Sequence, residues 1–192
     1  MNLPTITVFD LEFTAWEGSM ARRWLAPGEF KEVVQIGAVR LDAESFAVLA
    51  ECDLLVRPRI NARLSPYLEK LTGIQSEAVA RYGIDFADAY GRFLDFVGQS
   101  PIAAFGRDDK VLNDNLRLYG IAGAHPLPLF YDLRGWFAAL GIDPRGLHSC
   151  DLGPRLGLGF AGRAHNALDD ARSIAGAMAA MASRGARLKP AA

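Results

Sequence analysis

The sequence is poor in cysteine and has no long apolar run. Its two cysteines, Cys52 and Cys150, stand far apart and outside any paired metal-ligand spacing, so we expect buried thiols in a reducing compartment and no disulfide framework. No run of about 18 uninterrupted apolar residues occurs, and the N-terminus lacks a basic segment followed by a long apolar stretch. We therefore expect a soluble, cytoplasmic protein with no membrane segment.

An excess of charge of either sign is also absent. The 21 Lys and Arg residues balance 22 Asp and Glu residues, which gives a formal net charge of -1 at pH 7. This balance does not point to a polyanionic partner, although a local basic lining is compatible with it. The 192 residues, 51% of them hydrophobic, suffice for one compact domain. With no internal repeat or linker, we expect a single domain over 1–183 and a flexible tail over 184–192.

Strands are expected first in close succession and then in alternation with helices. Short β-rich or buried apolar segments predict strands over 5–11, 33–41, 46–56, 101–105 and 127–131. Capping signals and helical spacing of apolar residues predict helices over 65–73, 86–97, 110–119, 132–140 and 165–181. The segment 16–31 reads as a long loop. An antiparallel meander followed by βα units predicts a mixed α/β fold with a five-stranded sheet and helices on both faces.

Two carboxylates interrupt the apolar run of the first strand, VFDLEFTAWE. Asp10 and Glu12 are two positions apart, so they share one face of the strand near its end. Unpaired, they would repel each other there. Arginine partners would relieve this repulsion, and so would a divalent metal ion, for which carboxylate oxygens are natural ligands. The pair alone does not decide between these readings.

Two further acidic pairs stand at predicted helix N-termini. In AAFGRDDK, Asp108 and Asp109 follow a buried strand directly, and in RAHNALDDAR, Asp170 follows His165 by five residues with Asp169 beside it. Acids in these places also favour the helix through its dipole, and a capped N-terminus with a solvated histidine is the simplest structural reading. Each motif is weak in isolation.

Taken together and in this order, the three motifs resemble those of a known superfamily. D-x-E in the first strand, G-x-x-D after the fourth and H-x-x-x-x-D at the last helix are similar to the pattern of the DEDDh superfamily of 3'-5' exonucleases. The resemblance covers about residues 5 to 182 and includes EVVQIGAV and LSPYLEKLTGIQSE. FAGRAHNALDDARSIA looks most like the branch that contains the histone-mRNA 3' exonucleases and their bacterial relatives.

The resemblance implies an RNase H-like fold in which four acids bind two divalent metal ions, Mg²⁺ or Mn²⁺. The matching positions are Asp10, Glu12, Asp109 and Asp170, and Asp10 would bridge both metals. Asp109 lies three residues after Gly106 and Asp170 five after His165, as in the family; their neighbours Asp108 and Asp169 remain alternatives. His165 would be the general base, a role that suits its unperturbed pKa of about 6.5.

The resemblance also implies where a substrate would lie. The backbone at Phe13, Thr14 and Ala15 would contact the terminal 3' hydroxyl, and Leu71 would contact the last base. The aromatic and arginine side chains of the 16–31 loop are candidates for further stacking and phosphate contacts, although a loop packed by its own side chains explains them as well. Single-stranded 3' ends of RNA or DNA are the expected substrates.

The expected function is that of a metal-dependent 3'-5' exonuclease that releases nucleoside 5'-monophosphates, with RNA or short oligonucleotides preferred over DNA. The alternative is a module of the same fold that binds nucleic acid or protein without turnover. We expect a monomer or a homodimer. His125 and His148 are interpreted as surface or structural residues, and Gln35, where relatives often have an acid, is expected to matter little.

Overall fold

The computed structural model describes residues 4–123 and 126–188, so His125 lies outside the described residues. One mixed sheet forms its centre, with strands β1 (Thr5–Phe13), β2 (Val33–Asp42), β3 (Val48–Arg57), β4 (Ile84–Asp85), β5 (Ile102–Ala104) and β6 (Phe130–Asp132). The helical elements are α1 (Pro66–Thr72), α2 (Ser76–Tyr82), α3 (Phe86–Val97), α4 (Asp108–Leu118), α5 (Leu133–Ala139), η1 (Ser149–Asp151), α6 (Leu152–Arg155) and α7 (Ala167–Ala182).

The strand order in the sheet is β4-β3-β2-β1-β5-β6. β1, β2 and β3 form the predicted antiparallel meander, and β5 and β6 add to β1 in parallel. The mixed α/β architecture is confirmed, but the sheet has six strands where five were predicted. The additional strand, β4, has two residues and lies parallel to the end of β3. A segment this short has no periodicity that a sequence pattern could reveal.

The predicted helix boundaries follow from capping chemistry. Ser65 caps α1 by accepting a hydrogen bond from the Leu68 amide, Pro66 takes the first helical position, and Gly73 ends the helix with φ 79°. Gly98 follows the last residue of α3, as predicted. The short helices α2, η1 and α6 were not predicted: η1 and α6 have three and four residues, and α2 begins without a side-chain cap hydrogen bond.

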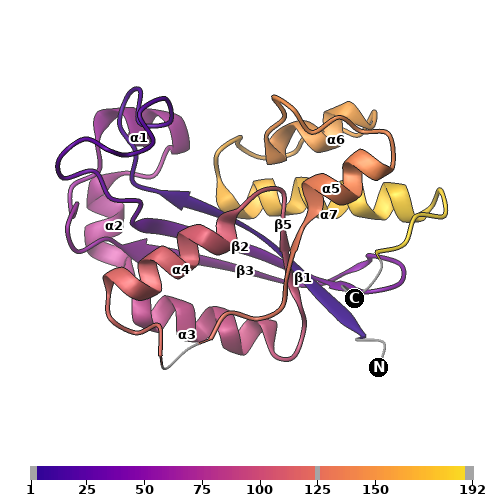
Figure 1. The fold of residues 1–192 in the computed structure, drawn as a ribbon, viewed down its shortest axis with the longest axis horizontal. Coiled ribbons are helices and arrows are strands. Elements are labelled where there is room, and N and C mark those ends of the chain that lie inside the picture. Colours follow the sequence, from indigo (N-terminus) through magenta and orange to yellow (C-terminus); the bar gives the residue numbers. More distant parts are fainter. Residues whose placement is uncertain (1–3, 124–125, 189–192) are drawn as a thin grey trace.

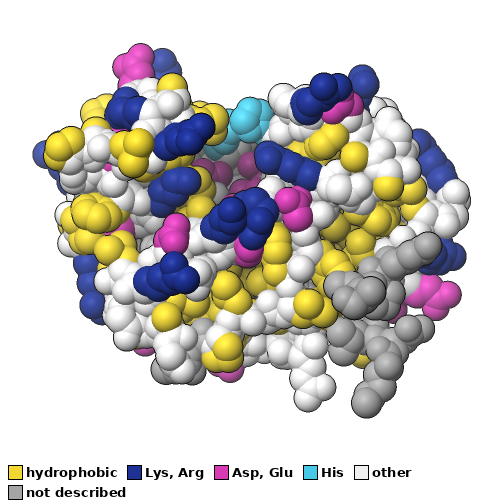
Figure 2. All heavy atoms as spheres, in the orientation of Figure 1, with side chains coloured by type: hydrophobic (Ala, Val, Ile, Leu, Met, Phe, Trp, Pro, Cys, Tyr) yellow, Lys and Arg dark blue, Asp and Glu magenta, His cyan; other side chains and the backbone are white. Residues whose placement is uncertain are grey.

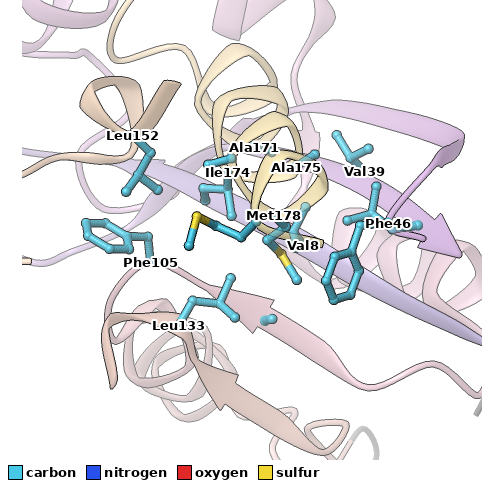
Figure 3. Packing of buried hydrophobic residues seen from close by; sticks show 14 of the residues in the cluster. Val8, Val39, Phe46, Phe105, Leu133, Leu152, Ala171, Ile174, Ala175 and Met178 are labelled. Atoms are coloured by element: carbon cyan, nitrogen blue, oxygen red, sulfur yellow. The ribbon is translucent and has the colours of Figure 1, made fainter. Parts of the chain in front are cut away.

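Helices cover both faces of the sheet, with α5, α6 and α7 over one face and α3 and α4 over the other (Figure 1). Alternation along β1 supplies both layers: Val8 packs in the cluster under α7, and Phe9 packs in the cluster against α3 and α4. Figure 3 shows Ile174 and Met178 of α7 pointing toward Val8. The apolar stripe of α7 is therefore core packing, as expected. Asp10 and Glu12 continue the Val8 face and so lie on the α7 side of the sheet.

The segment 184–188, expected to begin a flexible tail, packs on the same layer in the structure. Ala186 is buried in the α7 cluster, and the Arg187 carbonyl accepts a hydrogen bond of 3.0 Å from the Trp136 indole. Residues 189–192 lie outside the described part of the chain. Among the described residues, no helix is long and apolar enough to cross a bilayer.

Candidate active site

The two acids of β1 lie at the centre of the sheet. β1 is flanked by β2 and β5, and across the β2 ladder Asp10 is paired with Gly37 and Glu12 with Gln35. A side chain on the α7 face of β1 can thus contact residues that follow β5 on one side. On the other side it can contact residues of α7, which lies above β2. Glu12 is buried, with 7% of its surface exposed.

Gly37 and Gln35 fix the N-terminus of α7 directly above these acids. A Cβ atom on Gly37 would lie 2.1 Å from the Ala167 carbonyl carbon, so the helix touches the strand at a position that admits only glycine. Gln35 accepts a hydrogen bond from the Ala167 amide (3.0 Å) and donates one to Asp53 (2.8 Å). Gln35, from which the sequence led us to expect little, therefore holds the helix start in place.

The turn before α7 positions His165 and separates the roles of Asp169 and Asp170. His165 adopts φ 60°, and its amide donates a hydrogen bond of 3.2 Å to the Asp170 carboxylate. The carboxylate of Asp169 instead accepts the Arg163 amide at 2.8 Å and pairs with Arg172 at 2.9 Å. Asp170 is buried at 4% exposure beside Glu12 and His165, whereas Asp169 holds the turn.

At the other acidic pair, the structure places Asp108 and not Asp109 with the β1 acids. Asp109 forms a two-pronged ion pair with Arg107, with nitrogen to oxygen distances of 2.8 and 2.6 Å. The charge of Asp108, in contrast, acts on both Asp10 and Glu12 and raises the pKa of each. The choice of Asp109 from the family spacing therefore differs from the structure. Successive residues of a helix point about 100° apart, so only one residue of the pair can face the cluster.

Burial and mutual repulsion shape the electrostatics of the cluster. Burial raises the pKa of Asp10 well above its usual value, and Asp108, Glu12 and Asp170 raise it further. The pKa of Glu12 rises to about 8 through burial and then through the charges of Asp170 and Asp108. Burial is also the largest cause that raises the pKa of Asp108 to about 6 and that of Asp170 to about 7. Four carboxylates thus share a space that disfavours negative charge.

The cluster has the chemistry of a divalent cation site. Glu12, His165 and Asp170 each offer a ligand atom, and these atoms lie within 4.8 Å of one another. Asp170 Oδ1 is buried without a hydrogen-bond partner in the described structure. No lysine or arginine among residues 4–123 and 126–188 forms an ion pair with the four clustered acids, although the charge of Arg134 lowers the pKa of Asp108, so arginine pairing does not account for the cluster. Hard oxygen ligands with uncompensated charge therefore fit divalent metal ions.

Residues 148–151 complete the site, although no sequence pattern indicates them. The Ser149 hydroxyl donates a hydrogen bond of 2.7 Å to Asp10 Oδ1 and thereby lowers the pKa of Asp10. The exposed ring of His148, interpreted from the sequence as a surface or structural residue, lies edge-on to His165 with 5.7 Å between ring centroids. LHSCD contains no recognised motif, and these contacts arise only when η1 folds against the sheet.

Of the expected substrate contacts, Phe13, Thr14 and Ala15 follow directly after Glu12. The Thr14 amide donates to the Glu32 carbonyl at 2.9 Å, and the Thr14 carbonyl accepts the Trp24 indole at 2.9 Å, while the Ala15 carbonyl accepts the Ser65 hydroxyl at the start of α1. Leu71 is half-buried near the other end of α1. The segment 13–15 is thus held rigidly between β1 and α1.

The 16–31 loop is packed largely by its own side chains. Arg22 is paired with Glu29, and the Trp24 ring lies 5.6 Å from the Phe13 ring and 4.2 Å from the Lys31 ammonium nitrogen. Of the two readings left open for this loop, the structure favours self-packing for Arg22. Trp24 joins the loop to Phe13, directly after Glu12.

The site opens to solvent as a hollow in the surface. Figure 2 shows histidine on its upper rim, acidic side chains on its floor, and lysine and arginine side chains around it. Charges of both signs are thus concentrated at this hollow, although the net charge of the chain is almost zero.

The acids gathered where β1 and β5 end have the chemistry of the divalent-metal sites that metal-dependent hydrolases use. Residues 7–178 match the model of the Exonuclease family (RNase_T), and the chain belongs to this family. It is 26% identical over 200 residues to 3'-5' exoribonuclease 1 of Rattus norvegicus, covering 96% of this chain and 54% of that protein. The chain thus spans about half the length of this relative.

Solved structures show the same fold. The nuclease domain of 3'hExo, a DEDDh family member bound to rAMP, has a TM-score of 0.83 at 24% identity, covering 98% of this chain and 96% of that one. Cell-death related nuclease 4 (CRN-4) has a TM-score of 0.77 at 21% identity, over 95% of this chain and 65% of that one. The predicted RNase H-like fold and the resemblance to exonucleases are confirmed, and the family implies divalent metal ions.

Proposed function

We propose that the protein is a metal-dependent 3'-5' exonuclease that hydrolyses single-stranded nucleic acid from its 3' end. The observation that carries the proposal is the convergence of four acids, the buried Glu12 and Asp170 beside His165 and the half-buried Asp10 and Asp108 next to them. Its family membership supports the proposal. We place Asp108 in the role first assigned to Asp109, because Asp109 is engaged by Arg107.

The four acids would hold two divalent ions, Mg²⁺ or Mn²⁺, with Asp10 central among them. When bound, the ions supply Lewis-acid activation of water and charge stabilisation at the attacking and leaving oxygens. Ser149 contributes by holding Asp10 through its hydroxyl (2.7 Å). Gln35 contributes by fixing the start of α7, which carries Asp170.

His165 is suited to the role of general base. Burial and the neighbouring His148 lower its pKa, while Asp151 raises it, so the imidazole is neutral at pH 7 and can accept a proton. In the proposed step, His165 takes a proton from water as the water oxygen bonds to phosphorus. The bond from phosphorus to the upstream 3' oxygen breaks, that oxygen takes a proton from solvent and becomes a hydroxyl group, and a nucleoside 5'-monophosphate is released.

Direction and substrate class rest on the residues around the acids. The rigid segment 13–15 would receive the terminal 3' hydroxyl, and Leu71 would contact the last base. Preference for RNA is supported by the relative, an exoribonuclease, and by the neighbouring structure bound to rAMP. A single-stranded end fits because an exposed base can pack against apolar side chains.

The test uses 5'-labelled RNA and DNA oligomers of equal sequence with Mg²⁺, Mn²⁺ or EDTA. We expect a ladder that shortens from the 3' end, faster for RNA, and that is lost in EDTA and in Asp10→Ala and His165→Ala. Oligomers that remain intact but bind would overturn the proposal and favour the non-turnover binding module. Arg145→Gln, which removes an exposed ion pair with Asp143, is the control and should retain wild-type activity.

A further inference from the structure

Arg134 is a cation whose place in the fold brings it to the acid cluster. It is the second residue of α5, directly after β6, and its amide is fixed by a 3.0 Å hydrogen bond to Asp132. β5 and β6 are parallel neighbours, with Ala104 opposite Asp132, so the segments that follow them leave the same edge of the sheet. Ligands of α/β sheets bind at such edges. Asp108 follows β5 there, and Arg134 follows β6.

The side chains of Asp108, Arg134 and Phe105 lie close to Gly106. A Cβ atom on this glycine would lie 3.6 Å from an Asp108 carboxylate oxygen and 3.7 Å from the Arg134 guanidinium carbon. The guanidinium also lies 5.4 Å from the centre of the Phe105 ring, an arrangement that steadies its plane. The guanidinium thus lies at the Asp108 end of the acid cluster, with no side chain at Gly106 to cover it.

In the described structure the charge of Arg134 lowers the pKa of Asp108, but the two side chains form no ion pair. Within residues 4–123 and 126–188, no carboxylate forms an ion pair with Arg134, whereas the neighbouring Arg107 is bound twice by Asp109. An arginine with a steadied plane and free donors matches the two-pronged geometry that phosphate oxygens accept.

The cluster has two distinct ends. His165, Glu12 and Asp170 form one end, where α7 lies over β2 and β1. Asp108 and Arg134 form the other end, beyond β5. In phosphodiester hydrolysis, the attacking and leaving oxygens lie in line on opposite sides of phosphorus. If water is activated at the His165 end, the leaving 3' oxygen and the strand attached to it lie at the Arg134 end.

We propose that Arg134 binds the phosphate on the 5' side of the nucleotide that carries the leaving 3' oxygen. This inference rests on the proposed exonuclease function and deepens it: the substrate must be at least a 5'-phosphorylated dinucleotide to use every contact. Arg134 then holds the retained strand while the terminal nucleotide is removed. A substrate with only the scissile phosphate has nothing to place at this position.

Two dinucleotides that differ by one phosphate test the proposal. UpU contains only the scissile phosphate, whereas pUpU adds the 5' phosphate that Arg134 would bind. Wild-type enzyme is expected to prefer pUpU, and Arg134→Gln to lower kcat/KM for pUpU roughly 10- to 100-fold, the range for hydrogen bonds to a charged group. For UpU the change should stay within about twofold, and Arg134→Lys should restore part of the preference because a point charge remains. Arg145→Gln is the matched control and should keep the wild-type preference.

Equal losses on both dinucleotides would overturn the proposal, because Arg134 would then act on the scissile phosphate or through Asp108. No loss on either would also overturn it. If wild-type enzyme cleaves neither dinucleotide nor any oligomer, the exonuclease function itself fails. Independently of turnover, the Arg134 Nε–H resonance in EDTA should shift on titration with pUpU and not with UpU. Shifts that are equal or absent with both ligands would contradict the assignment.

Discussion

Among the single residues of the site, the buried carboxylates repel one another and so destabilise the folded protein when they are ionised. Glu12 is buried beside Asp170, Asp10 and Asp108, and the result is a pKa of about 8 where an ordinary glutamate has 4.5. A folded protein that holds such a group binds more protons than its unfolded chain between these two values. Its free energy of unfolding therefore falls as the pH rises through that window.

Glu12→Gln should stabilise the metal-free protein. The amide keeps the size of the side chain and removes the charge. In EDTA at pH 8 the variant should therefore have a higher melting temperature than wild type, and its free energy of unfolding should be larger by on the order of 1–3 kcal/mol. The gain should shrink toward pH 6.5, where Glu12 is protonated in the folded state. Thermal melts from pH 6.5 to 8 measure this, and a variant that melts below wild type at pH 8 would contradict the electrostatic account.

Asp108 and Asp109 are neighbours with different predicted importance. Asp108→Asn should lower kcat more than about 100-fold, above the loss typical of residues that only support metal ligands. Asp109→Asn removes an ion pair with an Arg107 that is half-exposed, and should change kcat by no more than about threefold. Single-turnover rates of both variants on one RNA oligomer test this. A larger loss in Asp109→Asn than in Asp108→Asn would restore the assignment of Asp109 based on family spacing.

At the scale of elements, the geometry of the site depends on how α7 meets β2. Gly37 is opposite Asp10 in the ladder, and Ala167 lies directly against it. This contact sets the height of the helix start above the sheet and hence the position of Asp170. The Gln35 hydrogen bond to the Ala167 amide fixes the same point.

Gly37→Ala should damage stability and activity together. The added methyl group would overlap the backbone of α7, which has no flexible end to move away, so the cost should be at least about 2 kcal/mol. Urea unfolding measures the loss, and Gly91→Ala, at a half-buried helical site with open space around an added Cβ, is the matched control and should not destabilise. Wild-type stability in Gly37→Ala would show that the helix is not held at this height.

The His165 turn is docked on α1 through Arg163. The Arg163 guanidinium donates a 3.0 Å hydrogen bond to the Lys70 carbonyl, and a Cβ atom on Gly73 would lie 2.6 Å from the guanidinium carbon. Arg163→Ala should therefore lower kcat roughly tenfold by loosening His165, with little change in melting temperature because the side chain is exposed. Steady-state kinetics and a thermal melt on the same sample test this. An unchanged kcat would show that the contact of Arg163 with α1 does not position His165.

How far the sequence predicts these elements depends on the length over which a pattern repeats. The two-residue period of β1 places Asp10 and Glu12 on one face, and the caps at Ser65 and Gly73 fix α1, so both features are predictable. β4, with two residues, and η1, with three, are too short to show a period. The choice between Asp108 and Asp109 depends on the rotation of α4, which tertiary packing sets. Ser149 reaches Asp10 across 139 positions of sequence, a contact no local pattern encodes.

At the scale of the whole molecule, the uncompensated acids make stability dependent on divalent ions. Ions that bind only the folded state raise its stability in proportion to the logarithm of their concentration above the dissociation constant. Mg²⁺ or Mn²⁺ should therefore raise the melting temperature of wild type at pH 8, and Asp10→Asn should reduce this rise. Thermal melts over a titration of the metal measure this. An equal rise in melting temperature in wild type and variant would show that the ions bind away from Asp10.

In the proposed reaction, water attacks phosphorus and the leaving group is the upstream 3' oxygen. Hydrolysis of an RNA oligomer in water enriched in ¹⁸O, with mass spectrometry of the first products, tests both points. We expect nucleoside 5'-monophosphates that carry the label on phosphate, and a shortened oligomer that ends in an unlabelled 3' hydroxyl. A labelled 3' phosphate, a 2',3'-cyclic phosphate or release from the 5' end would contradict the proposed reaction.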